Sequence, residues 1–245
     1  MDRYFHLSRT HTYSLLFAVP LLVLYEAGAA YLAQAGGPAL RNGADVMLRT
    51  LLAAGGVQGT LAFTGVLLGA ALLVVVLERR RRRVPLRAGV FGAMMLESVV
   101  YALLLGVVVG TATQWVLEGM RLRLAVGSAG VGELPLLHAV VLSLGAGIYE
   151  ELVFRVLLVG GLAGAFLASG LPRTRAGGFA ALLAALAFSA FHYIGPYGDP
   201  WEIPSFLFRF LAGLVFSVLF LLRGFGIAAW THALYDVFLF VGRGW

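Results

Sequence analysis

Two adjacent carboxylates, Glu150 and Glu151, lie inside an apolar stretch that runs from Leu134 to Leu171, and Arg155 follows them closely. Ionisable side chains at mid-bilayer depth cost roughly 2.5 to 3.5 kcal/mol each on insertion scales, so they usually face a protein interior or a hydrated cavity. On a helix Glu151 and Arg155 share a face, whereas Glu150 points elsewhere. We therefore expect the arginine to hold Glu151 and to leave Glu150 free for chemistry. A structural ion network of all three is the alternative.

Imidazole groups accompany these carboxylates in two other apolar stretches. His192 stands alone, whereas His232 is followed four residues later by Asp236, on the same helical face. One histidine in an apolar helix is usually a hydrogen-bonded core residue, but two beside a carboxylate pair indicate a site. Such a set can take a proton from water, polarise that water and donate to the oxyanion that forms when water adds to a carbonyl. The predicted reaction is amide hydrolysis.

Other hydrolytic machinery is missing from the sequence. There is no cysteine, no Gly-x-Ser-x-Gly and no His-Glu-x-x-His. Serine, thiol and HExxH zinc protease interpretations therefore lose support, and the chemistry must be carried by carboxylates and imidazoles.

The elements that must position these groups are membrane-spanning helices. Of the 245 residues, 60% are hydrophobic and 12% charged, whereas a soluble domain carries about 25% charged residues, and the mean hydropathy is +0.91. Several apolar runs approach the roughly 20 residues that cross a bilayer core, and none alternates as barrel strands do. We expect an all-α, polytopic transmembrane helix bundle of about seven spans, with the active-site cavity among the fourth, fifth and seventh.

The hydropathy and turn signals place these spans and their connections. We expect one integral membrane domain over residues 1–245, with spans 1–3 in residues 1–133 and the motif-bearing core in 134–245. Mixed-charge residues Glu118–Glu133 form a loop, and Leu48–Ala54 lies along the interface. His192 is expected near the outer end of its span and His232 near the inner end of its own. The expected spans are Tyr13–Ala35, Val57–Leu77, Ala88–Leu117, a fourth from Pro135 toward Gly164, Gly177–Tyr193, Ile203–Leu222 and Ile227–Val241, and Gly36–Pro38 ends the first.

Five consecutive arginines, Arg79–Arg83, are expected in a short loop after the second span. Positive residues stay in the cytoplasm, so the amino terminus is predicted to be cytoplasmic. The high Ala, Gly, Leu, Val and Arg content suggests a high-GC bacterial genome, so we expect a bacterial inner (plasma) membrane. The net charge of +6 is explained by orientation and contact with the lipid bilayer, and no nucleic-acid partner is expected. Glu26 is predicted to have a buried partner or a packing role, and Glu97 either contacts the site or pairs with an arginine such as Arg209.

Three short motifs in this order on three expected spans resemble the CPBP (Abi) family of intramembrane proteases, which includes the type II CAAX prenyl endopeptidases. The motifs are Glu-Glu-x-x-x-Arg, Phe-x-x-x-His and His-x-x-x-Asn or Asp, and the resemblance covers about Leu134 to Phe240. The residues that carry it are Glu150, Glu151, Arg155, Phe188, His192, His232 and Asp236.

The resemblance implies an intramembrane (metallo)protease that cleaves a membrane-associated protein or peptide. It implies that Glu150 is the general base, that His192 helps it to activate water, and that His232 and Asp236 form the oxyanion side. Glu151, with Arg155 and Phe188, would support them. Many prenyl-protease members have Asn where this chain has Asp236, which leaves the substrate class open between prenylated and other membrane-associated chains.

The resemblance also makes a metal ion a candidate cofactor, because family members are commonly called metalloproteases. Glu150, His192 and His232 are of the ligand types that zinc accepts, so a zinc-bound water and a glutamate-activated water are both consistent with the sequence. Two rival functions use the same residue types. One is proton-coupled membrane transport, against which no repeated half with broken helices is found; the other is a non-catalytic immunity or binding member of the same fold.

Overall fold

The computed structural model describes residues 2–35, 41–120, 135–195 and 198–242, and all regular elements within these ranges are helical. The expected ends and loops at Gly36–Pro38 and 121–133 lie outside the described residues. The elements are α1 (Asp2–Ser8), α2 (His11–Gln34), α3 (Gly43–Ala54), α4 (Thr60–Arg82), α5 (Ala88–Gly119), α6 (Leu136–Gly145), the π-helical segments η1 (Ala146–Glu150) and η2 (Leu152–Val159), α7 (Gly160–Ala168), α8 (Arg173–Phe191), α9 (Ile203–Arg223) and α10 (Phe225–Gly242).

Seven helices in the described ranges are long and apolar enough to cross a membrane. They are α2, α4, α5, the continuous run Leu136–Ala168 that joins α6, η1, η2 and α7, and then α8, α9 and α10. The all-α class and the seven spans predicted from hydropathy are thereby confirmed, and the chain is an integral membrane protein.

The run of arginines differs from its prediction as a loop. Arg79–Arg82 form the last turn of α4, and only Arg83, in the left-handed conformation, ends the helix. Arginine is a good helix former, and cations in a last turn interact favourably with the negative end of the helix dipole. The helix therefore continues past the apolar segment to the end of the arginine run.

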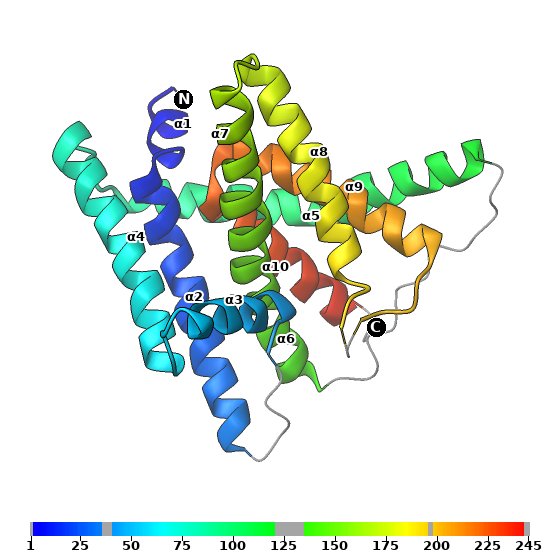
Figure 1. The fold of residues 1–245 in the computed structure, drawn as a ribbon, viewed down its shortest axis with the longest axis horizontal. Coiled ribbons are helices and arrows are strands. Elements are labelled where there is room, and N and C mark those ends of the chain that lie inside the picture. Colours follow the sequence, from blue (N-terminus) through cyan, green and yellow to red (C-terminus); the bar gives the residue numbers. More distant parts are fainter. Residues whose placement is uncertain (1, 36–40, 121–134, 196–197, 243–245) are drawn as a thin grey trace.

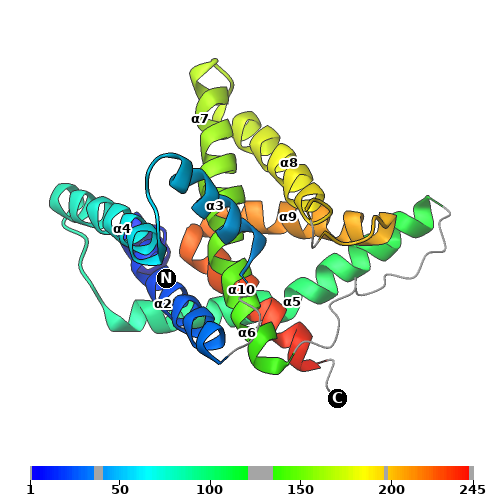
Figure 2. The same ribbon diagram turned by 60° about the horizontal axis from the view of Figure 1, so that its bottom comes forward.

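The helices that carry the motifs cross one another in the centre of the molecule. α7 and α8 lie side by side, α10 runs obliquely behind them, and α5 crosses the bundle at a steep angle to α2 and α4 (Figure 1). α3 lies crosswise against η1 (Figure 2). The short helix expected at Leu48–Ala54 thus begins earlier, at Gly43, because Asn42 caps it by accepting a hydrogen bond from Ala44 N over 2.9 Å.

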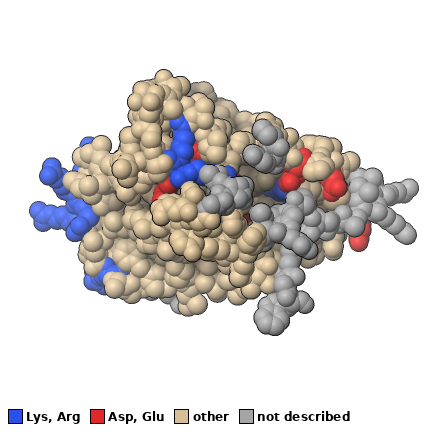
Figure 3. Space-filling model, turned by 90° about the horizontal axis from the view of Figure 1, so that it is seen from below, with Lys and Arg blue, Asp and Glu red and all other residues tan. Residues whose placement is uncertain are grey.

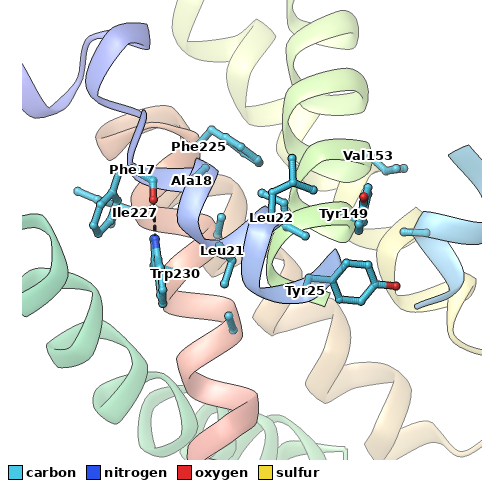
Figure 4. Packing of buried hydrophobic residues seen from close by; sticks show 14 of the residues in the cluster. Phe17, Ala18, Leu21, Leu22, Tyr25, Tyr149, Val153, Phe225, Ile227 and Trp230 are labelled. Carbon is cyan, nitrogen blue, oxygen red and sulfur yellow. Dashed lines mark hydrogen bonds between the residues drawn. The ribbon is translucent and has the colours of Figure 1, made fainter. Parts of the chain in front are cut away.

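The main core joins α2 to the fourth span and to α10. Leu21, Tyr25, Tyr149 and Ile227 are fully buried within it, and Figure 4 shows these side chains meeting between the helices. Trp230 Nε1 donates to the carbonyl oxygen of Phe17 over 2.7 Å, which ties α10 to α2. This packing sets the position of α10, and with it that of His232.

Candidate active site

The glutamate pair lies in a widened part of the fourth span. Glu150 ends η1 and Arg155 lies in η2, whereas the sequence reasoning assumed a regular α-helix. π-helical turns are usually short and often occur at functional sites. The η1 segment of the fourth span packs closely against α10. A Cβ added to Gly147 would lie 2.5 Å from the carbonyl oxygen of Ala229. Gly147 therefore allows the approach of α10 that brings His232 to the glutamates.

Glu151 is fully buried and serves two partners. Its Oε1 accepts a hydrogen bond from His232 Nδ1 over 2.8 Å. Its Oε2 lies 3.2 Å from Arg155 Nε, as an ion pair without hydrogen-bond alignment. The Arg155 guanidinium lies 4.4 Å from the ring centre of Phe188 and 5.3 Å from that of Phe216. Glu151 thus contacts Arg155, as their spacing predicts, and it also contacts His232 of α10.

Glu150 is oriented differently, as predicted. Its Oε1 accepts a hydrogen bond from Asn42 Nδ2 over 2.8 Å. Its Oε2 accepts none from the described protein groups, and it lies 3.9 Å from His192 Nε2 and 4.0 Å from His232 Nε2. These separations are too long for direct hydrogen bonds but short enough for one water molecule to contact both atoms of either pair. Glu150 Oε2 therefore lies at nearly the same distance from the two imidazoles, without a direct hydrogen bond to either.

The partners of each imidazole Nδ1 determine which nitrogen faces Glu150. His192 Nδ1 lies 2.8 Å from the carbonyl oxygen of Phe188, and His232 Nδ1 bonds the Glu151 carboxylate. Since both of these oxygens only accept, we assign a proton to each Nδ1, which leaves each Nε2 facing the Glu150 carboxylate. His232 Nε2 is also 3.7 Å from Asp236 Oδ2. His192 directly follows the last residue of α8 and His232 lies in the first half of α10, and both imidazoles lie within 4.0 Å of Glu150 Oε2.

These side chains line a cavity of about 500 Å³, a volume typical of small-molecule and peptide sites. All four residues predicted to be catalytic line it, together with Phe188, whereas Glu151 and Arg155 lie outside its lining. The fourth, fifth and seventh spans contribute, as expected, and so does α9 through Arg209, Ala212 and Phe216. The structure thus adds the sixth span to the predicted cavity wall.

Two contributors were missed by the sequence reasoning. Asn42 reaches Glu150 from the segment before α3, and Phe216 stacks on the imidazole of His232 with ring centres 4.4 Å apart. An N-cap signal exists in Asn42-Gly-Ala-Asp45, and it could have identified the start of α3. It says nothing of a contact with the fourth span, and a phenylalanine in an apolar helix carries no signal at all.

Glu26 has one fully buried partner, as predicted, and two partly buried ones. Its carboxylate accepts from Tyr149 and from the guanidinium groups of Arg41 and Arg49, which also pair with Asp45. Burial lowers the pKa of Arg41, but the hydrogen bonds and charges of Asp45 and Glu26 outweigh it and hold that pKa above the ordinary range. This network fixes α3 and the adjoining Asn42 against the fourth span.

Glu97 and Arg209, which the sequence also marked as charged residues within spans, are paired as well. Glu97 binds Arg223, with Nε to Oε1 at 2.6 Å, and also accepts from Tyr4. Of the two roles open for Glu97, the pairing with an arginine is observed, with Arg223 in place of Arg209. Arg209 instead pairs with Asp199 at the cavity.

The donor atoms at the site suit a metal in type but not in spacing. Two imidazole nitrogens and a carboxylate oxygen are zinc ligands, and each imidazole has the outer partner that such ligands usually have. Their separations of 3.9 and 4.0 Å exceed the roughly 3.4 Å between ligands of a tetrahedral zinc with bonds of about 2.1 Å. In the part of the chain that the structure describes, no group of three or more such side chains is arranged to hold a metal ion.

Comparison with known proteins finds one family model that matches the segment carrying the site. The family model described as type II CAAX prenyl endopeptidase Rce1-like matches residues 132–238, a segment that contains all three motifs and every predicted site residue. Residues 1–131 lie outside the match. Comparisons with curated proteins and with solved structures gave no match. The predicted resemblance is confirmed: through this segment the chain is related to the CPBP (Abi) family and to its Rce1-like, type II CAAX prenyl endopeptidases.

Proposed function

We propose that this chain is an intramembrane endopeptidase that hydrolyses a peptide bond in a membrane-associated protein or peptide. The family relation supports a membrane protease of the CAAX type. The observation that carries the finer proposal is the free Oε2 of Glu150, which faces His192 Nε2 and His232 Nε2 at the wall of the cavity. Residues 1–245 act as one membrane domain in this proposal, with the chemistry in 134–245.

In the proposed reaction, Glu150 and His192 hold a water molecule beside the substrate carbonyl. Glu150 Oε2 takes a proton from this water while the water oxygen forms a bond to the carbonyl carbon. His192 accepts from or orients the water through Nε2, because its Nδ1 is fixed to the Phe188 carbonyl. The proton held by Glu150 then passes to the leaving nitrogen as the carbon–nitrogen bond breaks. The products are a carboxylic acid and an amine.

The oxyanion formed by the attack is stabilised from the α10 side. His232, doubly protonated, donates from Nε2, and its positive charge is balanced by Glu151 at Nδ1 and by Asp236 near Nε2. Arg155 and Phe188 act through Glu151 and the imidazoles by fixing their positions. Zinc would require Glu150, His192 and His232 to lie closer together than they do here, and it would then supply Lewis-acid activation of the water.

Cleavage of membrane-anchored peptides in reconstituted vesicles tests this function. We expect Glu150→Gln and His192→Ala to lose cleavage by about a hundredfold or more, because each removes a group that contacts the attacking water. Glu118→Gln is the matched control, since it removes an exposed carboxylate on α5. Cleavage measured with and without a metal chelator shows whether the reaction depends on a metal ion.

The same vesicles separate hydrolysis from the two rival functions. Substrate-driven proton uptake that requires Glu150 without any cleavage would favour transport. Peptide binding that survives Glu150→Gln, again without cleavage by the unaltered chain, would favour a non-catalytic binding protein. Cleavage that both variants retain at the unaltered rate would contradict the proposal.

A further inference from the structure

A second hollow lies far from the glutamates, where α4 ends beside α2. It has a volume of about 630 Å³ and combines two kinds of wall. One wall is apolar and lies at membrane depth, whereas the other is made of guanidinium groups at the end of the span. We call it the arginine groove, and its lining residues are Leu16, Leu72, Val75, Val76, Arg79, Arg80, Arg83, Val84, Pro85 and Leu86.

The wall formed by residues 83–86 is fixed in place by α2. Tyr13, which is fully buried, donates its hydroxyl proton to the carbonyl oxygen of Pro85 over 2.8 Å and accepts from Arg87 N over 2.8 Å. Val84 within this wall is buried, and Arg83 turns the chain with a φ of 48°. The arginine groove is therefore a built feature of the fold, held by contacts between three parts of the chain.

The charge of the groove is not neutralised by its acidic neighbour. Glu78, directly before the arginines, is buried and accepts from Thr12 N over 2.6 Å, from Thr12 Oγ1 over 2.8 Å and from His11 N over 3.3 Å. The Glu78 carboxylate is thus engaged by hydrogen-bond donors at the amino-terminal end of α2. Between residues that the structure describes, no ion pair or side-chain hydrogen bond involves the guanidinium groups that line the groove, those of Arg79, Arg80 and Arg83. These three exposed cations keep their full capacity to bind an anion.

The order of the two walls matches the layout of a lipid molecule. Leu72 precedes Arg79 by seven residues, which is about 10 Å along the helix axis. The apolar wall therefore lies within the candidate span Thr60–Arg82 and the arginines lie at its end, where lipid phosphates are found. Figure 3 shows basic side chains projecting from the edge of the molecule on which Figure 1 places α4.

We propose that the arginine groove binds one anionic phospholipid. Its phosphate lies among Arg79, Arg80 and Arg83, and an acyl chain lies along Leu72 and Val76. The apolar wall distinguishes this ligand from free phosphate, and the three uncompensated guanidinium groups distinguish it from a zwitterionic lipid, whose own ammonium group offsets its phosphate. This site is independent of the glutamate site and of its proposed reaction.

Matched arginine variants of the full chain test the proposal. The groove variant combines Arg79→Gln, Arg80→Gln and Arg83→Gln. The control combines Arg81→Gln, Arg82→Gln and Arg87→Gln, which removes the same charge from the same region but from side chains outside the groove lining. Native mass spectrometry of delipidated protein would measure binding of phosphatidylglycerol and of phosphatidylcholine with identical acyl chains. Melting in phosphatidylcholine nanodiscs would check that both variants remain folded.

We expect the groove variant to bind phosphatidylglycerol at least tenfold more weakly than the unaltered chain, and the control variant to stay within twofold. Phosphatidylcholine binding should be weak and equal in all three proteins. Equal loss in the two variants would overturn the proposal, because general charge attraction would then suffice. No loss in the groove variant would overturn it as well. Full displacement of the lipid by millimolar inorganic phosphate would reassign the groove as a simple anion site.

Discussion

The side-chain amide of Asn42 donates to Oε1 of Glu150 over 2.8 Å, although the two residues are 108 positions apart in the chain. This bond fixes which carboxylate oxygen is engaged and which one faces His192 and His232. Asn42 Oδ1 at the same time accepts from Ala44 N and caps α3. One side chain thus couples the short helix over the site to the proposed general base, and the two functions of its amide can be separated by mutation.

Asn42→Asp should reduce the turnover number with little change in KM, and it should also lower stability. Ionised aspartate keeps an oxygen that caps α3, but it cannot donate to Glu150 and it places a second carboxylate beside that buried one. Loss of such an orienting partner typically lowers activity by roughly 10- to 100-fold. Asn42→Ala should lower activity too, and it should also cost about 1 kcal/mol of stability through the lost cap. Vesicle cleavage and thermal melting measure both effects, and an Asn42→Asp protein with full turnover would show that the bond is not needed.

Gly147→Ala should destabilise the protein and disrupt the site together. The added methyl group would lie 2.5 Å from the Ala229 carbonyl oxygen and 2.6 Å from the Ala233 Cβ, so α10 must move away from the fourth span. Overpacking of this kind costs about 1 to 3 kcal/mol. Gly164→Ala is the control on the same span, since nothing lies within 4 Å of its added Cβ, and it should be neutral or stabilising by up to about 1 kcal/mol. Equal unfolding free energies for the two variants would contradict the close packing of α10.

Arg155→Met should be among the most destabilising single changes in the core. Both Arg155 and Glu151 are fully buried, and removing one partner of a buried ion pair typically costs about 3 to 5 kcal/mol because the other charge is left uncompensated. Adding Glu151→Gln should recover part of this loss, since the neutral amide can still accept from His232. Arg175→Met, at an exposed position of α8, serves as the reference. If the double variant is as unstable as the sum of the two single variants, the residues do not act as a pair.

The sequence predicted the spans well because the length and hydropathy of each segment are local properties. The three motifs together predicted that Glu150, His192 and His232 would share one site, although the topology derived from the arginine run placed the two histidines near opposite ends of their spans. The π-helical turns were not predictable in this way, because they depend on how Gly147 packs against α10, about 80 residues later. Glu26 shows the same limit: its partner Arg49 lies in α3 and its partner Arg41 lies two residues before that helix begins, both beyond any helical spacing from Glu26.

A single-turnover cleavage in water enriched in ¹⁸O tests the central claim most directly. If Glu150 activates a water molecule that attacks the peptide carbonyl, the new carboxyl group of the amino-terminal fragment should carry one ¹⁸O atom in the first turnover. Glu150→Gln should yield almost no fragment under the same conditions, whereas Glu118→Gln should match the unaltered protein in both yield and label. An unlabelled fragment in the first turnover, or cleavage by Glu150→Gln at the unaltered rate, would contradict the account.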